Sequence, residues 1–346
     1  MAIDKPSDYF NTKLYTGNGS NNTSITGVGF QPDWVWVKAR NIEYGHKLFD
    51  VVRGQGKRLA SQSNAAESTV TDELTSFNSD GFTTNNNAGM NENNRPYVAW
   101  NWKAGTSFTN DASATGIGSI DSTGSVNTDA GFSIISYTGT ASAATVAHGL
   151  GAVPKMIIVK TRGSSGDWSV YHSSLGNTKN LKLNTTAAQQ TSASYWNNTT
   201  PTSSVFTIND EGNVNGSSVA MIAYCFAEKS GYSSMGQYTG NGNADGTFVY
   251  LGFKPAFLMR KRTDSTGRWV MEDNKRDTYN VVEKAVAANI ANAEGTGGYW
   301  DVDFTAQGFK VRNNDVEINA SGGSYIYMAF AENPFVTSTG VPATAR

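Results

Sequence analysis

The sequence predicts an all-β protein built from three tandem β-sandwich repeats of the jelly-roll or lectin-like kind. A motif recurs three times at matched offsets, short apolar runs alternate with polar ones, and turn-forming residues are frequent. Glycine accounts for 36 of the 346 residues, whereas charged residues make up only 16%. This composition favours short strands joined by tight turns, because glycine and asparagine reach positive φ at little cost.

The recurring motif opens with Tyr-Thr-Gly and runs to a closing aromatic residue. A proline follows each tyrosine at the same spacing of 17 residues, and an apolar run after the proline ends in a lysine. So many matched offsets indicate a repeat. The tyrosines, prolines, lysines and closing aromatics are Tyr15, Tyr137 and Tyr238; Pro32, Pro154 and Pro255; Lys38, Lys160 and Lys261; and Trp102, Phe226 and Phe330.

These offsets predict how the chain is divided. We expect three rigid sandwiches in series, forming a rod, with a flexible linker rich in Gly, Ser and Thr between the first two. The predicted segments are repeat 1 over 1–105, the linker over 106–129, repeat 2 over 130–229, repeat 3 over 230–335 and a polar tail over 336–346.

The strand after each proline is expected to be buried on both faces. In the first repeat, Trp34 and Trp36 alternate with Val35 and Val37, so neither face is polar. Such a strand lies in the middle of a sheet, inside a sandwich or beneath neighbouring copies. Flanking segments alternate apolar and polar residues, as expected for a strand with one face on a core.

Composition also excludes several classes of function. The net charge of −2 is spread evenly, so nucleic acid is not an expected partner. Cys225 is the single cysteine, so no internal disulfide forms. We expect no membrane insertion, because no apolar run approaches ~18 residues, and no secretory signal, because the first residues are polar. We therefore expect the protein to be made and kept in a cytosol.

The opening Met-Ala-Ile-Asp-Lys-Pro-Ser-Asp-Tyr-Phe-Asn, the run Val28-Gly-Phe-Gln-Pro-Asp-Trp-Val-Trp-Val-Lys and the Asp80-Gly-Phe turn resemble a known family. It is a repeated domain family of uncharacterised function in marine tailed-phage virion proteins, described as tail-fibre-like with a concanavalin-like lectin sandwich. The second repeat departs most from it, at His148-Gly149-Leu150 and Val153. The resemblance implies a place on a virion surface, after assembly in the host cytoplasm, and supplies no catalytic residues.

Candidate ligand-binding residues are aromatic pairs in polar loops, because sugars bind to aromatic faces flanked by amides and hydroxyls. Tyr195 with Trp196, and Tyr299 with Trp300, are these pairs, although core packing is the competing interpretation. No cofactor is expected, except that Ca²⁺ suits an oxygen-rich turn. The candidate calcium ligands are Asn209, Asp210, Glu211 and Asn213.

Residues with catalytic chemistry are expected to be structural. His46, His148 and His172 stand at non-equivalent repeat positions and outside any metal or triad spacing. Asp301 and Asp303 lie on one strand face, near the spacing that a glycosidase needs, but a solvated edge explains them as well.

We therefore expect a non-enzymatic structural protein of the virion surface. Its expected partners are other virion proteins and host surface glycan, and we expect it to form a homo-oligomer. A tail-fibre or receptor-binding component, acting in host attachment, is the first hypothesis. The alternative is a capsid (head) decoration protein, and a polysaccharide depolymerase is a third.

Overall fold

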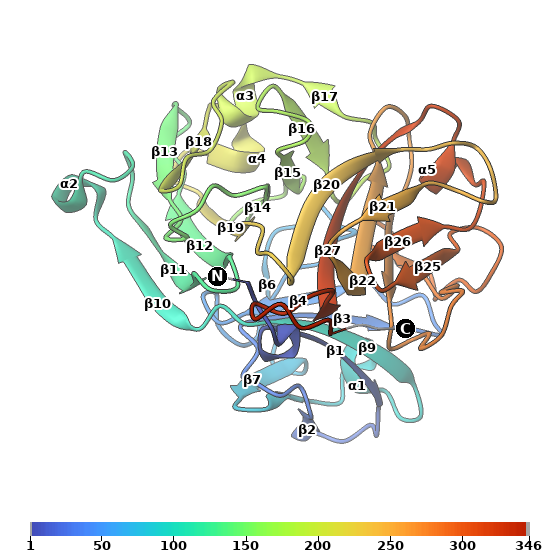
Figure 1. The fold of residues 1–346 in the computed structure, drawn as a ribbon. Helices are drawn as coiled ribbons and strands as arrows, with labels where there is room; N and C mark the ends of the chain where they lie inside the picture. Colours follow the sequence, from blue (N-terminus) through green and yellow to red (C-terminus); the bar gives the residue numbers. More distant parts are fainter. Residues whose placement is uncertain (1, 344–346) are drawn as a thin grey trace.

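The computed structural model of the chain describes residues 2–343, and β-strands dominate it (Figure 1). Every ladder between its named strands is antiparallel, and the helices are single turns. The all-β class predicted from the turn-rich composition is therefore confirmed. No helix within residues 2–343 is long and apolar enough to cross a membrane.

The first sandwich, residues 10–102, packs a four-stranded inner sheet of order β1-β9-β3-β4 against an outer sheet of order β2-β8-β7. A 3-10 turn, η1 (Pro6–Asp8), precedes it. Its elements are β1 (Phe10–Thr16), β2 (Thr23–Thr26), β3 (Trp34–Ala39), β4 (Lys47–Asp50), β5 (Lys57–Arg58), β6 (Ser68–Thr69), β7 (Leu74–Asn78), β8 (Gly81–Thr84), α1 (Ala88–Asn91) and β9 (Pro96–Trp102).

The second sandwich, residues 106–226, contains the strand order β12-β19-β14-β15 within an eight-stranded sheet, with β13-β18 as the outer layer. Its elements are β10 (Thr106–Asn110), α2 (Ala112–Thr115), β11 (Ser122–Asn127), β12 (Phe132–Thr138), β13 (Ala144–Ala147), β14 (Met156–Thr161), β15 (Ser169–His172), β16 (Lys179–Lys182), β17 (Gln190–Thr191), α3 (Ala193–Trp196), β18 (Val205–Ile208), α4 (Gly212–Asn215) and β19 (Ala220–Phe226).

The third sandwich, residues 233–334, has an inner sheet of order β20-β27-β22-β23-β24 and an outer sheet of order β21-β26-β25. The inner sheets of all three sandwiches thus contain the same strand order. That the three sandwiches are copies of one repeat remains a prediction from the sequence. The elements are β20 (Ser233–Thr239), β21 (Phe248–Tyr250), β22 (Phe253–Arg262), β23 (Trp269–Asp273), β24 (Val286–Ala287), β25 (Val302–Thr305), β26 (Gly308–Val311), α5 (Val316–Asn319) and β27 (Ser324–Pro334).

The strand after each proline is buried along its length in the first two sandwiches, as its two apolar faces predict. In β3, Trp34 and Trp36 point to one side and Val35 and Val37 to the other. The valines pack against the outer sheet of their own sandwich. The tryptophans enter a core shared by all three inner sheets, where Trp34 stacks on Tyr224 with ring centroids 4.4 Å apart.

This shared core corrects the expectation of a rod. The three inner sheets turn toward one another, so the sandwiches surround a common centre and are not arranged end to end (Figure 1). Phe10 illustrates the closure, because its ring contacts Trp102 of the first sandwich and both Phe257 and Phe330 of the third. Burying the inner faces together removes the largest apolar side chains from water.

The expected linker over 106–129 is also corrected. Strands β10 and β11 occupy much of it, and β11 pairs with β12 in register from Ser122 opposite Tyr137 to Asn127 opposite Phe132. Their serines and threonines give these strands the composition of a linker. Backbone hydrogen bonds hold these polar strands in the sheet, and such bonds need no apolar side chains.

Equivalent contacts join the sandwiches in a closed ring. The Trp168 indole donates to the carbonyl oxygens of Ala60 and Ser63 in the first sandwich, and the Trp269 indole donates to Lys182 O in the second. At the matching position in the first sandwich, His46 Nε2 lies 3.0 Å from Ala287 O of the third. His46, Trp168 and Trp269 stand at equivalent positions, and each contacts the sandwich that precedes its own around the ring.

An equivalent asparagine holds the turn after each Tyr-Thr in place. Asn91, Asn215 and Asn319 are buried at the ends of α1, α4 and α5. The Oδ1 atom of each accepts a backbone N–H, from Asn18 at 2.9 Å, Thr140 at 2.7 Å and Asn241 at 2.9 Å respectively. These hydrogen bonds join segments 73 to 78 residues apart, so each asparagine ties the turn to the helical turn that contains it.

Candidate functional site

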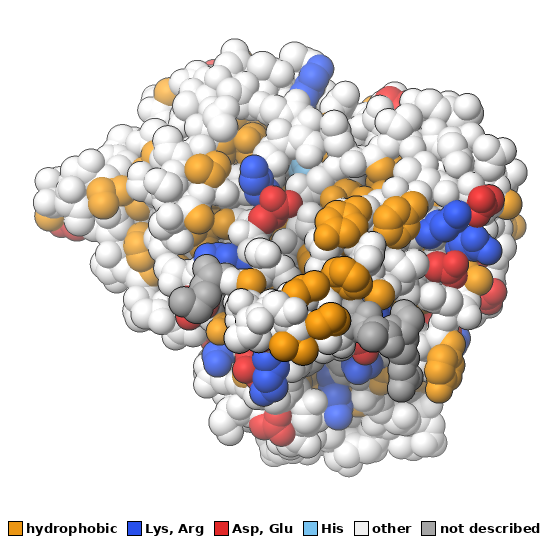
Figure 2. Space-filling model, in the orientation of Figure 1, with side chains coloured by type: hydrophobic (Ala, Val, Ile, Leu, Met, Phe, Trp, Pro, Cys, Tyr) orange, Lys and Arg blue, Asp and Glu red, His pale blue; other side chains and the backbone are white. Residues whose placement is uncertain are grey.

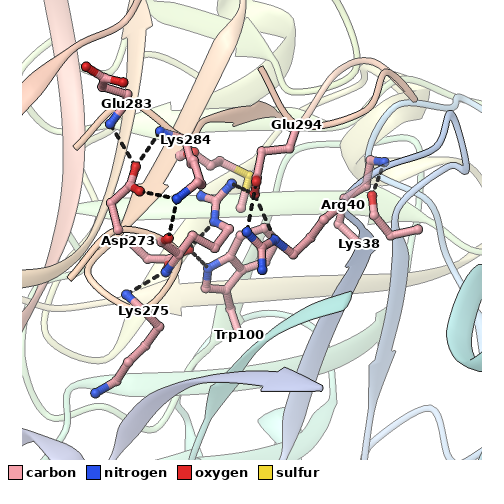
Figure 3. Close-up of polar contacts among 12 residues, drawn as sticks. Lys38, Arg40, Trp100, Asp273, Lys275, Glu283, Lys284 and Glu294 are labelled. Carbon is pink, nitrogen blue, oxygen red and sulfur yellow. Dashed lines mark hydrogen bonds and ion pairs between the residues drawn. The ribbon is translucent and has the colours of Figure 1, made fainter. Parts of the chain in front are cut away.

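Two parts of the structure are candidate functional sites. One is a buried polar network between the first and third sandwiches, and the other is an open groove in the third. The buried network is drawn in Figure 3. Arg40 of the first sandwich makes a two-pronged contact with Glu294 of the third, with Nε–Oε2 and Nη2–Oε1 distances of 3.0 and 2.9 Å. The Trp100 indole donates to Asp273 Oδ2 at 3.1 Å.

Arg276 completes this network beneath the surface. Its Nε lies 2.6 Å from Asp273 Oδ2 and its Nη1 lies 3.3 Å from Glu294 Oε2. Burial alone lowers the pKa of Arg276, but the carboxylates of Asp273 and Glu294 outweigh it and raise that pKa overall. Every charge in this network is matched, and its side chains are almost wholly enclosed, so the arrangement joins sandwiches and leaves no reactive group free.

The buried lysines at the equivalent positions Lys38, Lys160 and Lys261 are structural as well. Burial lowers the pKa of each ammonium group to about 8. Each Nζ donates to the carbonyl oxygen of the next residue, and Lys160 and Lys261 reach across to Asn64 O and Thr186 O of the preceding sandwich. Lys160 and Lys261 therefore hold a loop of the preceding sandwich, whereas Lys38 binds Ile42 O of its own sandwich.

The open groove lies on the third sandwich and has a volume of about 460 Å³. Tyr299 and Trp300, just before β25, form part of its wall, and Val286 and Ile290 supply aliphatic surface around β24. Tyr299 exposes 67% of its surface, which leaves its ring open to a ligand. The remaining lining residues are Arg268, Glu283, Ala287, Asn292, Ala293, Gly295, Thr296, Gly297, Asp315 and Glu317.

Trp300 is held in position by charged neighbours. Its indole donates to Glu317 Oε2 at 3.0 Å, and the Arg268 guanidinium lies over its ring, 5.5 Å from the centroid. Arg268 also donates through its backbone N–H to Glu317 Oε1 and through Nη1 to Oε2. The three side chains fix one another, so this wall of the groove is organised before any ligand arrives.

The structure separates the four aromatic candidates. Tyr299 and Trp300 lie together in the groove, and their role in binding stays a prediction. Tyr195 and Trp196 lie in α3 and expose only 3% and 1% of their surface, which corrects their candidacy. Trp196 packs edge-on against Tyr171, with centroids 5.8 Å apart, because the short helix turns both rings into the sandwich core.

The candidate calcium turn forms the start of α4. Asn213 Oδ1 accepts the backbone N–H of Asp167 at 2.8 Å, and its amide group donates to Glu211 Oε1 at 3.0 Å. Asn209 donates to Ala193 O, and Asp210 is exposed. Within residues 2–343, no three His, Cys, Asp or Glu side chains gather as a metal site would require. Calcium binding at this turn stays a prediction.

Asp301 and Asp303 are both engaged in local contacts. Asp301 accepts hydrogen bonds from the Gly298 backbone and from Asn313, while Asp303 pairs with Arg312 at 3.3 Å. The three histidines are buried, and Cys225 is enclosed in β19. Sequence reasoning missed Arg268, Glu283, Asp315 and Glu317 as groove residues. They are scattered over fifty positions, and only the packing of β24 and α5 beside Tyr299 brings them together.

The chain belongs to the family described as "Domain of unknown function (DUF7483)", whose family model matches residues 5–334. Neither the curated proteins nor the solved structures contain a match to the chain.

Proposed function

We propose that this member of the family is a non-enzymatic structural protein of a phage virion surface that recognises host glycan through the groove at Tyr299 and Trp300. The phage setting rests on the resemblance of the opening segment and of the run from Val28 to Lys38. The glycan-binding role rests on the groove.

The single observation that carries the proposal is an exposed tyrosine ring in a preorganised groove. The apolar face of a sugar ring packs on an aromatic face, while its hydroxyls need nearby amides and carboxylates. Here Asn292 and Asp315 line the same groove as Tyr299. A volume of about 460 Å³ also falls in the range of ordinary small-molecule sites, roughly 300–1,000 Å³.

A head-decoration protein is the second candidate, and the shared core favours it. Three sandwiches around one centre make a short body, whereas a long fibre needs units in series. The first residues lie against the segments that flank the third sandwich, since Ile3 donates its N–H to Ser230 O and Asp4 accepts from Ser338. A compact body of this shape suits a short appendage or a capsid decoration better than a long fibre.

A binding experiment with matched variants tests the glycan role. Tyr299→Ala removes the ring from the groove, and Tyr250→Ala removes a similarly exposed tyrosine from β21, outside it. Apolar side chains gather over β21 and the C-terminal segment in the centre of Figure 2, so Tyr250 belongs to a separate surface. We expect adsorption to host polysaccharide on a glycan array to fall at least tenfold for Tyr299→Ala only.

Equal binding by both variants contradicts the glycan role of the groove. Copy number and position of the polypeptide in a virion reconstruction then separate tail from head: few copies at the tail support the receptor-binding assignment, whereas hundreds over the capsid support decoration. Release of reducing ends from host polysaccharide by the purified protein would instead establish a depolymerase.

A further inference from the structure

The groove carries an excess of negative charge once its internal ion pair is counted. Arg268 is its one basic residue, and Glu317 neutralises that guanidinium through an Nη1–Oε2 contact of 2.9 Å. Both Glu317 oxygens are occupied, because the Arg268 backbone and the Trp300 indole bind them as well. Asp315 and Glu283 remain, and neither forms an ion pair with another described residue.

Asp315 presents a carboxylate with spare acceptor capacity. One oxygen, Oδ1, accepts the Glu317 N–H at 2.8 Å and so begins α5. A carboxylate has room for about three more hydrogen bonds. Burial raises the pKa of Asp315 and is the largest cause; the charge of Glu317 adds to the rise, while the Glu317 backbone N–H and the Arg268 charge partly offset it. Because the net shift is upward, a cation beside this half-buried carboxylate relieves part of its burial cost.

Glu283 stands at the rim beside a glycine-rich loop. A side-chain carbon built at Gly297 would lie 3.4 Å from Glu283 Oε2, so this carboxylate rests directly against the loop. Gly297 has a φ of +66°, the left-handed region that favours glycine. The loop from Gly295 to Tyr299 therefore runs close to one acid and carries the exposed ring at its end.

We propose, building on the glycan-binding function above, that the groove selects a sugar residue with a protonated amino group and disfavours sugars with carboxylate or sulfate groups. The ring packs on Tyr299, and the ammonium group donates to Asp315 and Glu283. An ammonium group offers three donors, and its charge is attracted by both acids. An anionic sugar in the same groove brings its charge near these carboxylates and is repelled.

Calorimetric titration with three matched probes tests the selection. The probes are tetrasaccharides of glucosamine or galactosamine, their N-acetylated counterparts, and tetragalacturonate, at about pH 6 and low salt. The amine probe is expected to bind about tenfold more tightly than the acetylated one, since a charge-assisted hydrogen bond contributes roughly one such factor. Tetragalacturonate is expected not to bind, and added salt to weaken the amine probe selectively.

Isosteric variants show which carboxylates are responsible for binding the amine probe. Asp315→Asn keeps the oxygen that begins α5, because asparagine is as good a helix-capping residue as aspartate. It is expected to bind the amine probe about tenfold more weakly and the acetylated probe unchanged, and Glu283→Gln is expected to behave similarly. Glu43→Gln, an exposed acid on the first sandwich, is the control and leaves both affinities unchanged.

The outcomes separate this inference from the proposed function. Equal affinity for amine and acetylated probes, both lost in Tyr299→Ala, overturns the amine selection and leaves the glycan groove intact. Tighter binding of tetragalacturonate overturns the selection as well. If no probe binds, or if Tyr299→Ala, Asp315→Asn and Glu283→Gln all leave binding unchanged, both the glycan-binding groove and the amine selection are contradicted.

Discussion

Replacing Glu294 with glutamine removes the charge that joins the first and third sandwiches. This side chain exposes only 9% of its surface and receives Arg40 at 2.9 Å and Arg276 at 3.3 Å (Figure 3). Glutamine has nearly the same shape, so the change removes charge without opening a cavity. Arg276, which is fully enclosed, then keeps only Asp273 as its counter-charge.

The expected cost is about 2–3 kcal/mol in the free energy of unfolding. Removing one partner of a buried ion pair costs roughly 3–5 kcal/mol. The lower figure applies because Asp273 remains beside Arg276 and the glutamine oxygen still accepts one hydrogen bond. Gln189 is the matched control. Its backbone N–H donates to Thr263 O at 2.9 Å, as the backbone N–H of Glu294 donates to Arg40 O. Its Oε1 has no hydrogen-bond partner among the described residues, so Gln189→Ala should cost less than about 1 kcal/mol.

Equilibrium unfolding in guanidinium chloride, followed by tryptophan fluorescence and circular dichroism, measures these values. A double-mutant cycle with Arg40→Thr, the residue type found at position 263, isolates the pairwise term. We expect a coupling of at least about 1 kcal/mol between Arg40 and Glu294. A loss under about 0.5 kcal/mol for Glu294→Gln, or strict additivity in the cycle, refutes the reasoning.

Three further predictions concern buried residues. Trp196→Ala should lower the free energy of unfolding by about 3–5 kcal/mol in chemical denaturation and leave glycan binding unchanged, since the ring is core. Burial lowers the pKa of His46, His148 and His172 to about 3, 4 and 4. An unfolded histidine titrates near 6.5, so the unfolded chain binds more protons below that pH. Stability should therefore fall as pH drops from about 6.5 to 4, by up to about 1.4 kcal/mol per pH unit for each histidine; a flat profile argues otherwise. Burial raises the pKa of the Cys225 thiol to about 12, so a thiol reagent should label it only after unfolding; rapid labelling of the native protein contradicts its enclosure.

Much of the fold could be predicted because its signals are local. Alternating apolar residues and turn glycines specify strands, and the two apolar faces of Trp34 to Val37 specified burial on both sides. The sequence left open what covers the second face. The structure places the other two inner sheets there, since Trp34, Tyr224 and Phe330 come from different sandwiches and meet in one core.

The candidate site was less predictable because it depends on long-range packing. Tyr195-Trp196 and Tyr299-Trp300 look alike as dipeptides in polar loops. The first pair lies in a helical turn that directs both rings inward, whereas the second follows a bent, glycine-rich loop just before β25. The residues next to Tyr299 in the sequence do not indicate that Asp315 and Glu317 line the same groove. Only the tertiary fold brings the α5 segment, which carries both acids, to that place.

A crystal structure of the protein soaked with fragments of host polysaccharide tests the central claim most directly. Our account predicts a sugar ring on the face of Tyr299, with a polar substituent near Asp315. Saturating fragment bound at another surface, with the groove of the third sandwich left open, would contradict it.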